Sequence, residues 1–310
     1  MDDIWNFKSI NLGRELETAG EFIYESAKKM IGINDFSNKY EINLILYTGS
    51  VGIERLQKIL LCLYCINSAD DFDNPPKCLL THNHLDLQNE IQKNVDCSLA
   101  KTSMSLLGVF QDYYNQYRYG NYSLGNEKDV RELMVRFFKK CNKPLDIESP
   151  YTEHQKDLLA KTYINNVGKI AKQYYEIIRE KAFQLNIYTY EMDSYSNALR
   201  VFYLEEGKTL FDQMFNERIS VKELMIYIRK YNKSEGVFKL LNEIEPLDYD
   251  PALVMDYIHD LCRGNVTDFL YSYTDELYCE IPTERKKAER KALVDLIGSN
   301  DLILDDDFAD

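Results

Sequence analysis

The sequence predicts an all-α protein with an N-terminal up-and-down helical bundle followed by a second helical region. Long stretches carry apolar residues at steps of three and four, the period of one helix face. Prolines, which helix interiors avoid, leave long uninterrupted gaps. Only residues 185–190 are rich enough in β-branched and aromatic residues to form a short strand, and an extended connector is the alternative. The seven prolines are Pro75, Pro76, Pro144, Pro150, Pro246, Pro251 and Pro282.

The prolines also divide the chain, at about 143–151 and about 245–251. We assign residues 1–142 to the bundle and residues 151–310 to the second helical region. The last ten residues, 301–310, form a short acidic tail.

The bundle is organised around a predicted helix at about 40–66, which is apolar on nearly every side and therefore belongs at the centre. An amphipathic helix precedes it and ends near Gly32. Gly49 and Gly52 lie inside the central helix, where each glycine costs about 1 kcal/mol relative to alanine. We therefore expect a close helix contact or a bend at these two positions. A short helix from about His84 and a longer one through residues 104–117 complete four helices.

The second region opens with a helix of about 30 residues that carries an apolar stripe from Tyr163 to Leu185. A helix at residues 127–141 precedes it. Shorter helices are expected at about 194–204, 207–216, 220–231, 251–263, 267–278 and 283–297.

Composition restricts the classes of partner. A net charge of −14 repels nucleic acid and anionic lipid, so neither is a favoured partner without a local basic patch. The N-terminus carries no export signal, and seven cysteines stand in apolar surroundings, which is typical of reduced thiols. The longest apolar run is interrupted by Glu54, Arg55 and Lys58, so it is too polar to span a membrane. We expect a soluble, cytoplasmic protein.

Three short motifs place polar groups against the central helix. They are GluArgLeuGlnLysIleLeuLeu at 54–61, HisAsnHisLeuAspLeu at 82–87 and ArgTyr at 118–119. Over residues 1–125 this pattern resembles the HEPN domain, a family of small helical bundles. The resemblance implies a link to ribonuclease toxins, abortive infection, CRISPR effectors or nucleotide binding, often in dimers whose sites meet at the interface.

Nucleases of that family share an arginine followed four to six residues later by a histidine, and no such pair occurs in this chain. Either nuclease activity is absent, or His84 and Arg118 meet in space from separate helices. RNA cleavage needs a base and a cation, so His82, His84 and Arg118 are the candidate catalytic residues of a metal-independent ribonuclease. In the simpler interpretation, the two histidines cap a helix and Arg118 pairs with Glu54 inside the bundle. Candidate polar core or ligand-binding residues are Glu54, Arg55, Lys58 and Tyr119.

Cys62 and Cys65, with His82 and His84, have the residue types of a zinc site. The spacing argues against one, because both cysteines stand within an apolar helix and His-x-His differs from the usual His-x3–5-His. We predict buried structural cysteines and no metal. With 13 glycines and no phosphate-binding or hydrolase motif, the sequence indicates no cofactor.

Two further segments are candidates for contacts. The basic run at 283–292 alternates with acidic residues, which favours a solvated helix face over a nucleic-acid site. The tail could be a frayed end, or could dock into a basic groove on a partner. Its candidate partner-binding residues are Leu302, Ile303, Leu304, Asp305, Asp306, Asp307 and Phe308.

These features lead to one preferred function and two alternatives. We expect a non-catalytic interaction or regulatory component with a protein partner, in a prokaryotic antiviral defence or toxin-type system as the resemblance implies. The alternatives are a HEPN-like ribonuclease with a rearranged site and a structural adaptor that binds through helix faces and its tail. A homo-oligomer through the N-terminal bundle also remains open.

Overall fold

The computed structural model describes residues 3–68, 70–119, 128–188, 192, 197–204, 206–230, 241–242, 244–263 and 267–297. All regular structure in these ranges is helical, and they contain no strand, which confirms the all-α prediction. Residues 189–190 of the strand candidate and the whole tail at 301–310 lie outside the described residues. The chain forms two compact units, residues 1–215 and 216–310.

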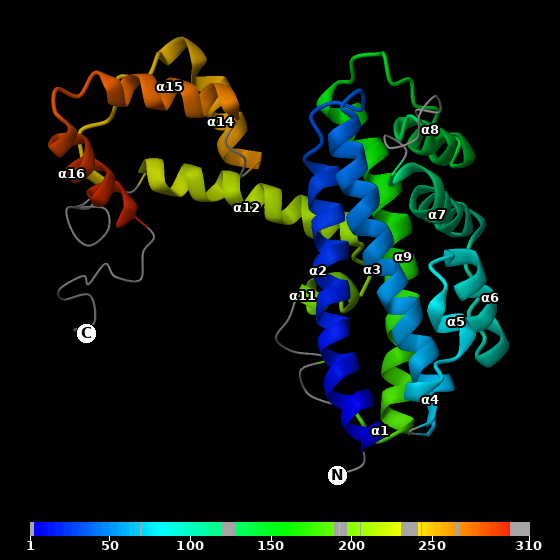
Figure 1. The fold of residues 1–310 in the computed structure, drawn as a ribbon. Coiled ribbons are helices and arrows are strands. Elements are labelled where there is room, and N and C mark those ends of the chain that lie inside the picture. Colours follow the sequence, from blue (N-terminus) through cyan, green and yellow to red (C-terminus); the bar gives the residue numbers. More distant parts are fainter. Residues whose placement is uncertain are drawn as a thin grey trace. The chain divides into compact units, whose positions relative to one another are not determined.

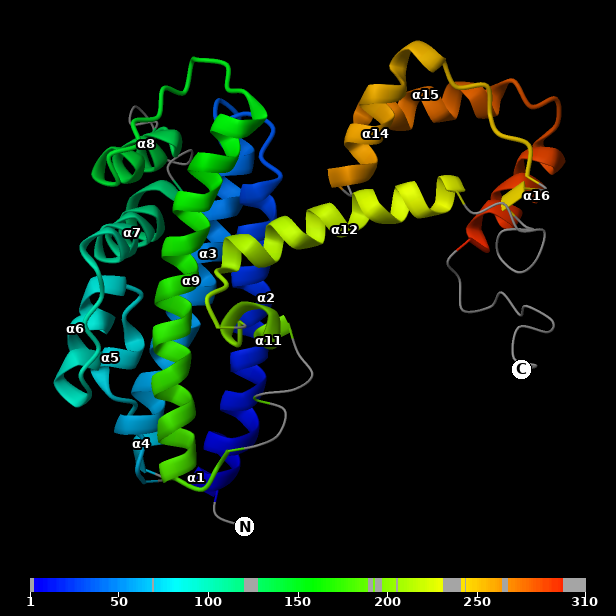
Figure 2. The same cartoon turned by 180° about the vertical axis from the view of Figure 1, so that it is seen from behind.

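Three long helices form the centre of the first unit. They are α2 (Leu12–Ile31), α3 (Lys39–Cys65) and α9 (Glu153–Gln184), which run side by side along their length (Figures 1 and 2). The middle of the predicted central helix is buried in α3, where Ile45, Ile53 and Leu56 have no exposed surface. Burial on almost all sides of α3 follows from its apolar composition.

The two glycines of α3 allow its neighbours to approach closely. A Cβ atom at Gly49 would lie 2.6 Å from the hydroxyl oxygen of Tyr163 in α9. A Cβ atom at Gly52 would lie 2.6 Å from Cγ1 of Ile23 in α2. Both distances are too short for real side chains, so the expected close helix contact at Gly49 and Gly52 is confirmed.

Shorter helices pack along α3 on the side away from α2 (Figure 1). They are α5 (Lys77–Leu80), α6 (His84–Asn94), α7 (Lys101–Asp112) and α8 (Arg131–Lys140), with the single turn α4 (Asp70–Asp73) before them. The prediction that His82 and His84 cap α6 was wrong, because the side chain of Asn83 accepts the backbone N–H groups of Leu85 and Asp86.

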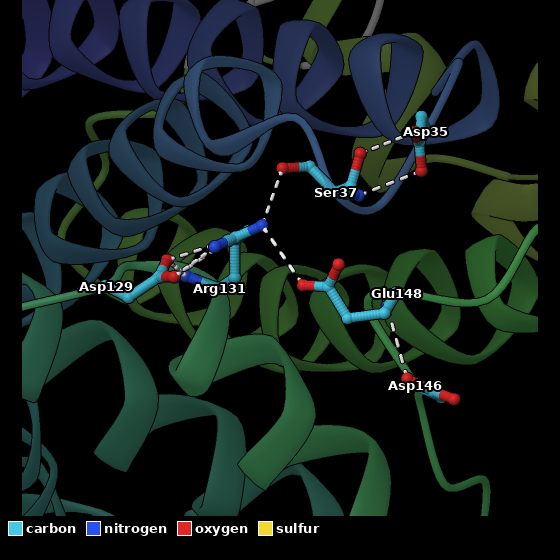
Figure 3. Close-up of polar contacts among 6 residues, drawn as sticks. All are labelled: Asp35, Ser37, Asp129, Arg131, Asp146 and Glu148. Carbon is cyan, nitrogen blue, oxygen red and sulfur yellow. Dashed lines mark hydrogen bonds and ion pairs between the residues drawn. The ribbon is translucent and has the colours of Figure 1, made fainter.

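Arg131 connects three loops at one end of the first unit (Figure 3). Its Nη1 donates to the carbonyl oxygen of Ser37 at 3.0 Å, and its Nη2 lies 2.6 Å from Oδ2 of Asp129. Glu148 Oε1 lies 3.9 Å from the same Nη1. These loops precede α3, α8 and α9, so one guanidinium group contacts the segments before three helices, most closely those before α3 and α8.

The remaining helices complete the first unit and build the second. The short α11 (Asn197–Phe202) packs on α2 and α9 (Figure 2).

The sequence placed the division between regions at 143–151, and the structure places it near residue 215, because α9 packs against α2 and α3. The helix α12 (Leu210–Lys230) begins in the first unit and continues into the second. The second unit contains η4 (Pro251–Leu253), α14 (Val254–Arg263), α15 (Asp268–Cys279) and α16 (Glu284–Asp295). No described helix is both long and apolar enough to cross a membrane.

Candidate functional site

A pocket of about 490 Å³ opens beside α3 in the first unit. Its walls come from segments far apart in the sequence, and we call it the α3 pocket. The lining residues are Phe7, Leu12, Glu15, Tyr47, Val51, Glu54, Arg55, Lys58, Ile59, Cys62, His82, Tyr114 and Arg118.

One face of α3 forms the floor of the pocket. Tyr47, Val51, Glu54, Lys58 and Cys62 follow each other at steps of three and four, so their side chains emerge on the same side of the helix. This face of α3 carries the charged side chains of Glu54 and Lys58, whereas most of the helix is apolar. The spacing that makes a helix face therefore assembles the polar floor.

The opposite wall comes from the loop before α6 and from η2 (Tyr113–Tyr117), a π-helical turn that continues α7. The ring of His82 stacks on the ring of Tyr114, with centroids 4.6 Å apart and planes inclined by 22°. Single π-helical turns often occur at functional sites, because the extra residue re-aims the side chains that follow. The turn supplies Tyr114 and is followed by Arg118.

Glu54 is the most connected charge in the pocket. Its Oε1 lies 2.8 Å from Nδ1 of His82 and 2.9 Å from Nζ of Lys58, and its side chain is only 13% exposed. Burial raises the pKa of Glu54, but the hydrogen bonds and positive charges of Lys58 and His82 outweigh burial, so its pKa lies below the ordinary value. Glu54 is therefore a carboxylate at neutral pH and holds both partners in place.

Arg118 is held by aromatic rings instead of by an acid. Its guanidinium carbon lies 5.1 Å from the ring centre of Tyr47, 5.1 Å from that of Tyr114 and 5.2 Å from that of Tyr119. The expected pair between Arg118 and Glu54 is not formed; Oε1 of Glu54 contacts Lys58 and His82 instead. Among the residues that the structure describes, no acidic side chain pairs with Arg118. Cation–π contacts position a guanidinium group while leaving its N–H donors available.

The remaining charges of the lining are paired. Arg55 forms an ion pair with Glu15 of α2, and its guanidinium carbon lies 5.5 Å from the ring centre of Phe22. Lys58 pairs with Glu54. With these two pairs balanced, Arg118 gives the lining one surplus positive charge, within a chain whose net charge is −14.

His84 is absent from the lining of the α3 pocket. Its ring is fully buried, and Nδ1 lies 2.9 Å from Oε1 of Gln57, whose amide nitrogen in turn donates to the His84 carbonyl. Burial lowers the pKa of His84 to about 4, so its ring is neutral at neutral pH. The same Gln57 nitrogen lies 3.1 Å from the hydroxyl oxygen of Tyr174, which donates to Gln88. This network places His84 in the core.

The structure thus brings together some of the residues singled out from the sequence and separates others. Glu54, Arg55, Lys58, His82 and Arg118 share one pocket. Tyr119 is largely exposed and contacts the site through the guanidinium group of Arg118.

Sequence reasoning did not assign the other lining residues to a site, among them Phe7, Glu15, Tyr47 and Tyr114. Tyr47 is seven residues before Glu54 on the same helix face, so its spacing was a usable signal. Glu15 comes from α2, and only the packing of α2 on α3 brings it to the pocket.

The cysteines near the pocket are poor metal ligands. Burial raises the pKa of Cys62 to about 11, assisted by the neighbouring Cys65 and Cys78, and burial likewise raises the pKa of Cys65 to about 11. Metal binding requires the thiolate, and the raised pKa values keep both thiols protonated at neutral pH. In the described part of the chain, no three histidine, cysteine or acidic side chains are grouped so as to hold a metal ion.

The basic run at 283–292 falls in α16. Thr283 caps this helix by accepting the backbone N–H of Lys286. Lys287 lies 2.8 Å from Glu284, and Arg285 lies 3.1 Å from Glu289, all on a largely solvent-exposed helix. This arrangement is the solvated helix face that the alternating charges predicted.

Comparison with known proteins adds no relative. The chain matches no protein-family model, no curated protein and no solved structure. The HEPN-like character of the bundle therefore stays a prediction, and function rests on the chemistry of the α3 pocket.

Proposed function

We propose that this chain is a non-catalytic regulatory component whose first unit binds a small anionic ligand in the α3 pocket. The observation that supports this proposal most strongly is Arg118, a cation held between tyrosine rings with no acidic partner among the described residues. Binding an anion there completes the charge balance of the lining without breaking an existing ion pair.

The size and lining of the pocket fit a small molecule. A volume of about 490 Å³ lies within the range of small-molecule sites, which combine apolar walls with a few placed polar groups. Phe7, Leu12 and Ile59 supply apolar wall, and Tyr114 supplies an aromatic edge. A ligand with one phosphate or carboxylate group and a compact apolar or ring portion meets both kinds of surface.

The position of the pocket suits regulation. Its lining joins η1 (Phe7–Asn11), α2, α3, the loop before α6 and η2. A ligand that contacts all of these stabilises the arrangement in which they meet, by mass action on the folded state. The antiviral or toxin-type setting implied by the resemblance is part of the same proposal.

Thermal unfolding of the full chain with separate additions of inorganic phosphate, simple carboxylates and nucleoside monophosphates tests the proposal. At least one anion is expected to raise Tm for wild type and for Arg136→Gln, the matched control. Arg136 pairs with Asp112 and does not line the pocket. The shift is expected to vanish in Arg118→Gln. An equal shift in Arg118→Gln, or no shift with any anion, contradicts the proposal.

A metal-independent ribonuclease is the second candidate, because one observation favours it specifically. His82 and Arg118 line the same pocket, and Nδ1 of His82 lies 2.8 Å from the carboxylate of Glu54. If Nδ1 of His82 donates to Glu54, the other ring nitrogen is the one that faces a substrate as acid or base. Arg118 supplies a cation for charge developing on a phosphate.

RNA cleavage in the presence of a chelator distinguishes the two candidates. The ribonuclease predicts cleavage by wild type and by the control His154→Ala, and loss of cleavage in His82→Ala. His154 is an exposed residue in the first turn of α9. If wild type does not cleave RNA, only the binding function remains.

The third candidate is an adaptor that acts through helix faces and residues 301–310. It predicts that deleting this tail releases a protein partner.

A further inference from the structure

The described residues of the second unit bury very little apolar surface. Among its described residues only Asp260 and Leu277 are buried. Large apolar side chains are instead exposed on the second-unit part of α12, on α14, on α15, and on α16 with the turn after it. They are Ile219, Val221, Leu224, Ile226, Ile228, Val254, Met255, Ile258, Leu261, Phe269, Tyr271, Leu293, Val294 and Ile297.

On α14 the exposed apolar side chains follow a regular helical spacing. Val254, Ile258 and Leu261 follow each other at steps of four and three, so they lie on one helix face beside Met255. Met255 is 71% exposed and Leu261 is 62% exposed. A soluble helix of this pattern buries its apolar face against another element.

Aromatic contacts and hydrogen bonds hold α14 against α15 and against the segment that precedes α14. The ring of Tyr249 contacts those of Tyr257 and Tyr273, with centroids 5.3 and 5.8 Å apart. The Tyr249 hydroxyl lies 2.7 Å from Oγ1 of Thr274, and the hydroxyl of Tyr273 accepts the backbone N–H of Asp250. These contacts join the start of α14 to α15, while Val254, Met255, Ile258 and Leu261 stay exposed.

The charges of the unit indicate what covers this face. Residues 248–280 carry many acidic residues and a single basic one, Arg263. The following helix, α16, is net basic, with five basic residues against Glu284, Glu289 and Asp295. The acidic residues are Asp248, Asp250, Asp256, Asp260, Asp268, Asp275, Glu276 and Glu280. The basic residues of α16 are Arg285, Lys286, Lys287, Arg290 and Lys291.

A surface with an acidic part and a basic part is complementary to itself. In a two-fold dimer, α16 of one copy can face the acidic α14–α15 segment of the other, and each contact occurs twice. An anionic membrane or nucleic acid would instead be repelled by the acidic segment that flanks the apolar face. Charge therefore favours a second copy of this chain as the occupant.

We propose that the described helices of the second unit form a homodimerisation surface, with the apolar face of α14 at its centre and α16 as its net basic rim. Dimerisation buries the exposed apolar side chains that the unit does not bury by itself. It also presents two α3 pockets per assembly, whatever ligand they bind.

Analytical ultracentrifugation of the full chain over a range of concentrations tests this inference. Wild type is expected to sediment with twice the monomer mass of 36.4 kDa. Met255→Glu and Leu261→Glu are each expected to weaken the dimer at least about tenfold, as for a central interface residue. Lys286→Glu, on the rim, is expected to weaken it less and to reduce its salt dependence.

The matched control is Leu80→Glu in α5 of the first unit, where Leu80 is 64% exposed. This variant is expected to dimerise like wild type, and helical circular dichroism checks that every variant is folded. Two results overturn the inference. One is a wild-type monomer at every concentration; the other is a dimer that neither Met255→Glu nor Leu261→Glu weakens, which would point to the N-terminal bundle instead.

Discussion

Nδ1 of His82 lies 2.8 Å from Oε1 of Glu54, while the His82 ring stacks on Tyr114. The pair joins the floor of the α3 pocket to its opposite wall, since Glu54 is on α3 and His82 is in the loop before α6. Lys58 binds the same carboxylate oxygen of Glu54, and Arg118 contacts the rings of Tyr47 and Tyr114 instead of this carboxylate. The charge pattern of the site depends on this one carboxylate.

The first prediction concerns Glu54 and pH. Its pKa is lower in the folded protein than in the unfolded chain, so the carboxylate stabilises the fold above its unfolded pKa, and this contribution is lost as pH falls through the folded pKa. Glu54→Gln is expected to lower the free energy of unfolding at neutral pH by about 1–2 kcal/mol. The difference should shrink below about pH 4. Urea denaturation at several pH values measures it, and an equal difference at all pH values contradicts this explanation.

The second prediction concerns His84, which acts in a different pH range. Burial lowers its pKa to about 4 from an ordinary value of 6.5, so the unfolded chain binds the proton more readily. Stability is therefore expected to fall as pH decreases from about 6.5 to about 4, through this group. In His84→Asn the same decrease should be smaller, although the variant is less stable at pH 7. Unchanged pH dependence in His84→Asn would show that other groups cause it.

The third prediction tests the close helix contacts at the glycines of α3. Gly49→Ala and Gly52→Ala each place a Cβ atom 2.6 Å from a neighbouring helix. Overpacking costs typically about 1–3 kcal/mol, against a gain of up to about 1 kcal/mol in helix propensity. Both variants are expected to be destabilised. The matched control is Gly108→Ala in α7, where a Cβ atom meets nothing within 4 Å, so this variant should be neutral or slightly stabilised.

The fourth prediction concerns Arg131, which connects the loops before α3, α8 and α9 (Figure 3). Arg131→Gln removes its ion pair with Asp129 and its bond to the Ser37 carbonyl. The expected loss is about 1–3 kcal/mol in chemical denaturation. Arg136→Gln, which removes a more exposed pair with Asp112, should lose less than about 1 kcal/mol. Equal losses would contradict a special role for Arg131.

The sequence predicted much of the fold because its signals are local. The apolar residues of α3 occur on nearly every side of the helix, which requires burial wherever the other helices lie. Gly49 and Gly52 also gave a local signal, because a glycine inside a helix is unfavourable unless a neighbouring helix approaches closely there. Two helices were expected at 207–216 and 220–231, and this was wrong, because α12 is one continuous helix over Leu210–Lys230. The division near residue 215 falls inside that helix and has no proline to mark it.

The site was predicted only in part. His82 and His84 are two residues apart, yet His82 lines the pocket and His84 is buried behind Gln57. Which of the two faces the pocket depends on how the start of α6 sits on α3, and no local pattern determines that. The tyrosine contacts of Arg118 likewise depend on the π-helical turn at η2, where an ordinary helix would point these side chains elsewhere.

Titration calorimetry of wild type and Arg118→Gln, with the anion that gives the largest Tm shift in wild type, tests the central claim most directly. We expect wild type to bind one equivalent per chain and Arg118→Gln to bind at least about tenfold more weakly, the loss of a charge-assisted contact. Equal affinity in the two proteins would contradict the claim that Arg118 anchors an anionic ligand in the α3 pocket.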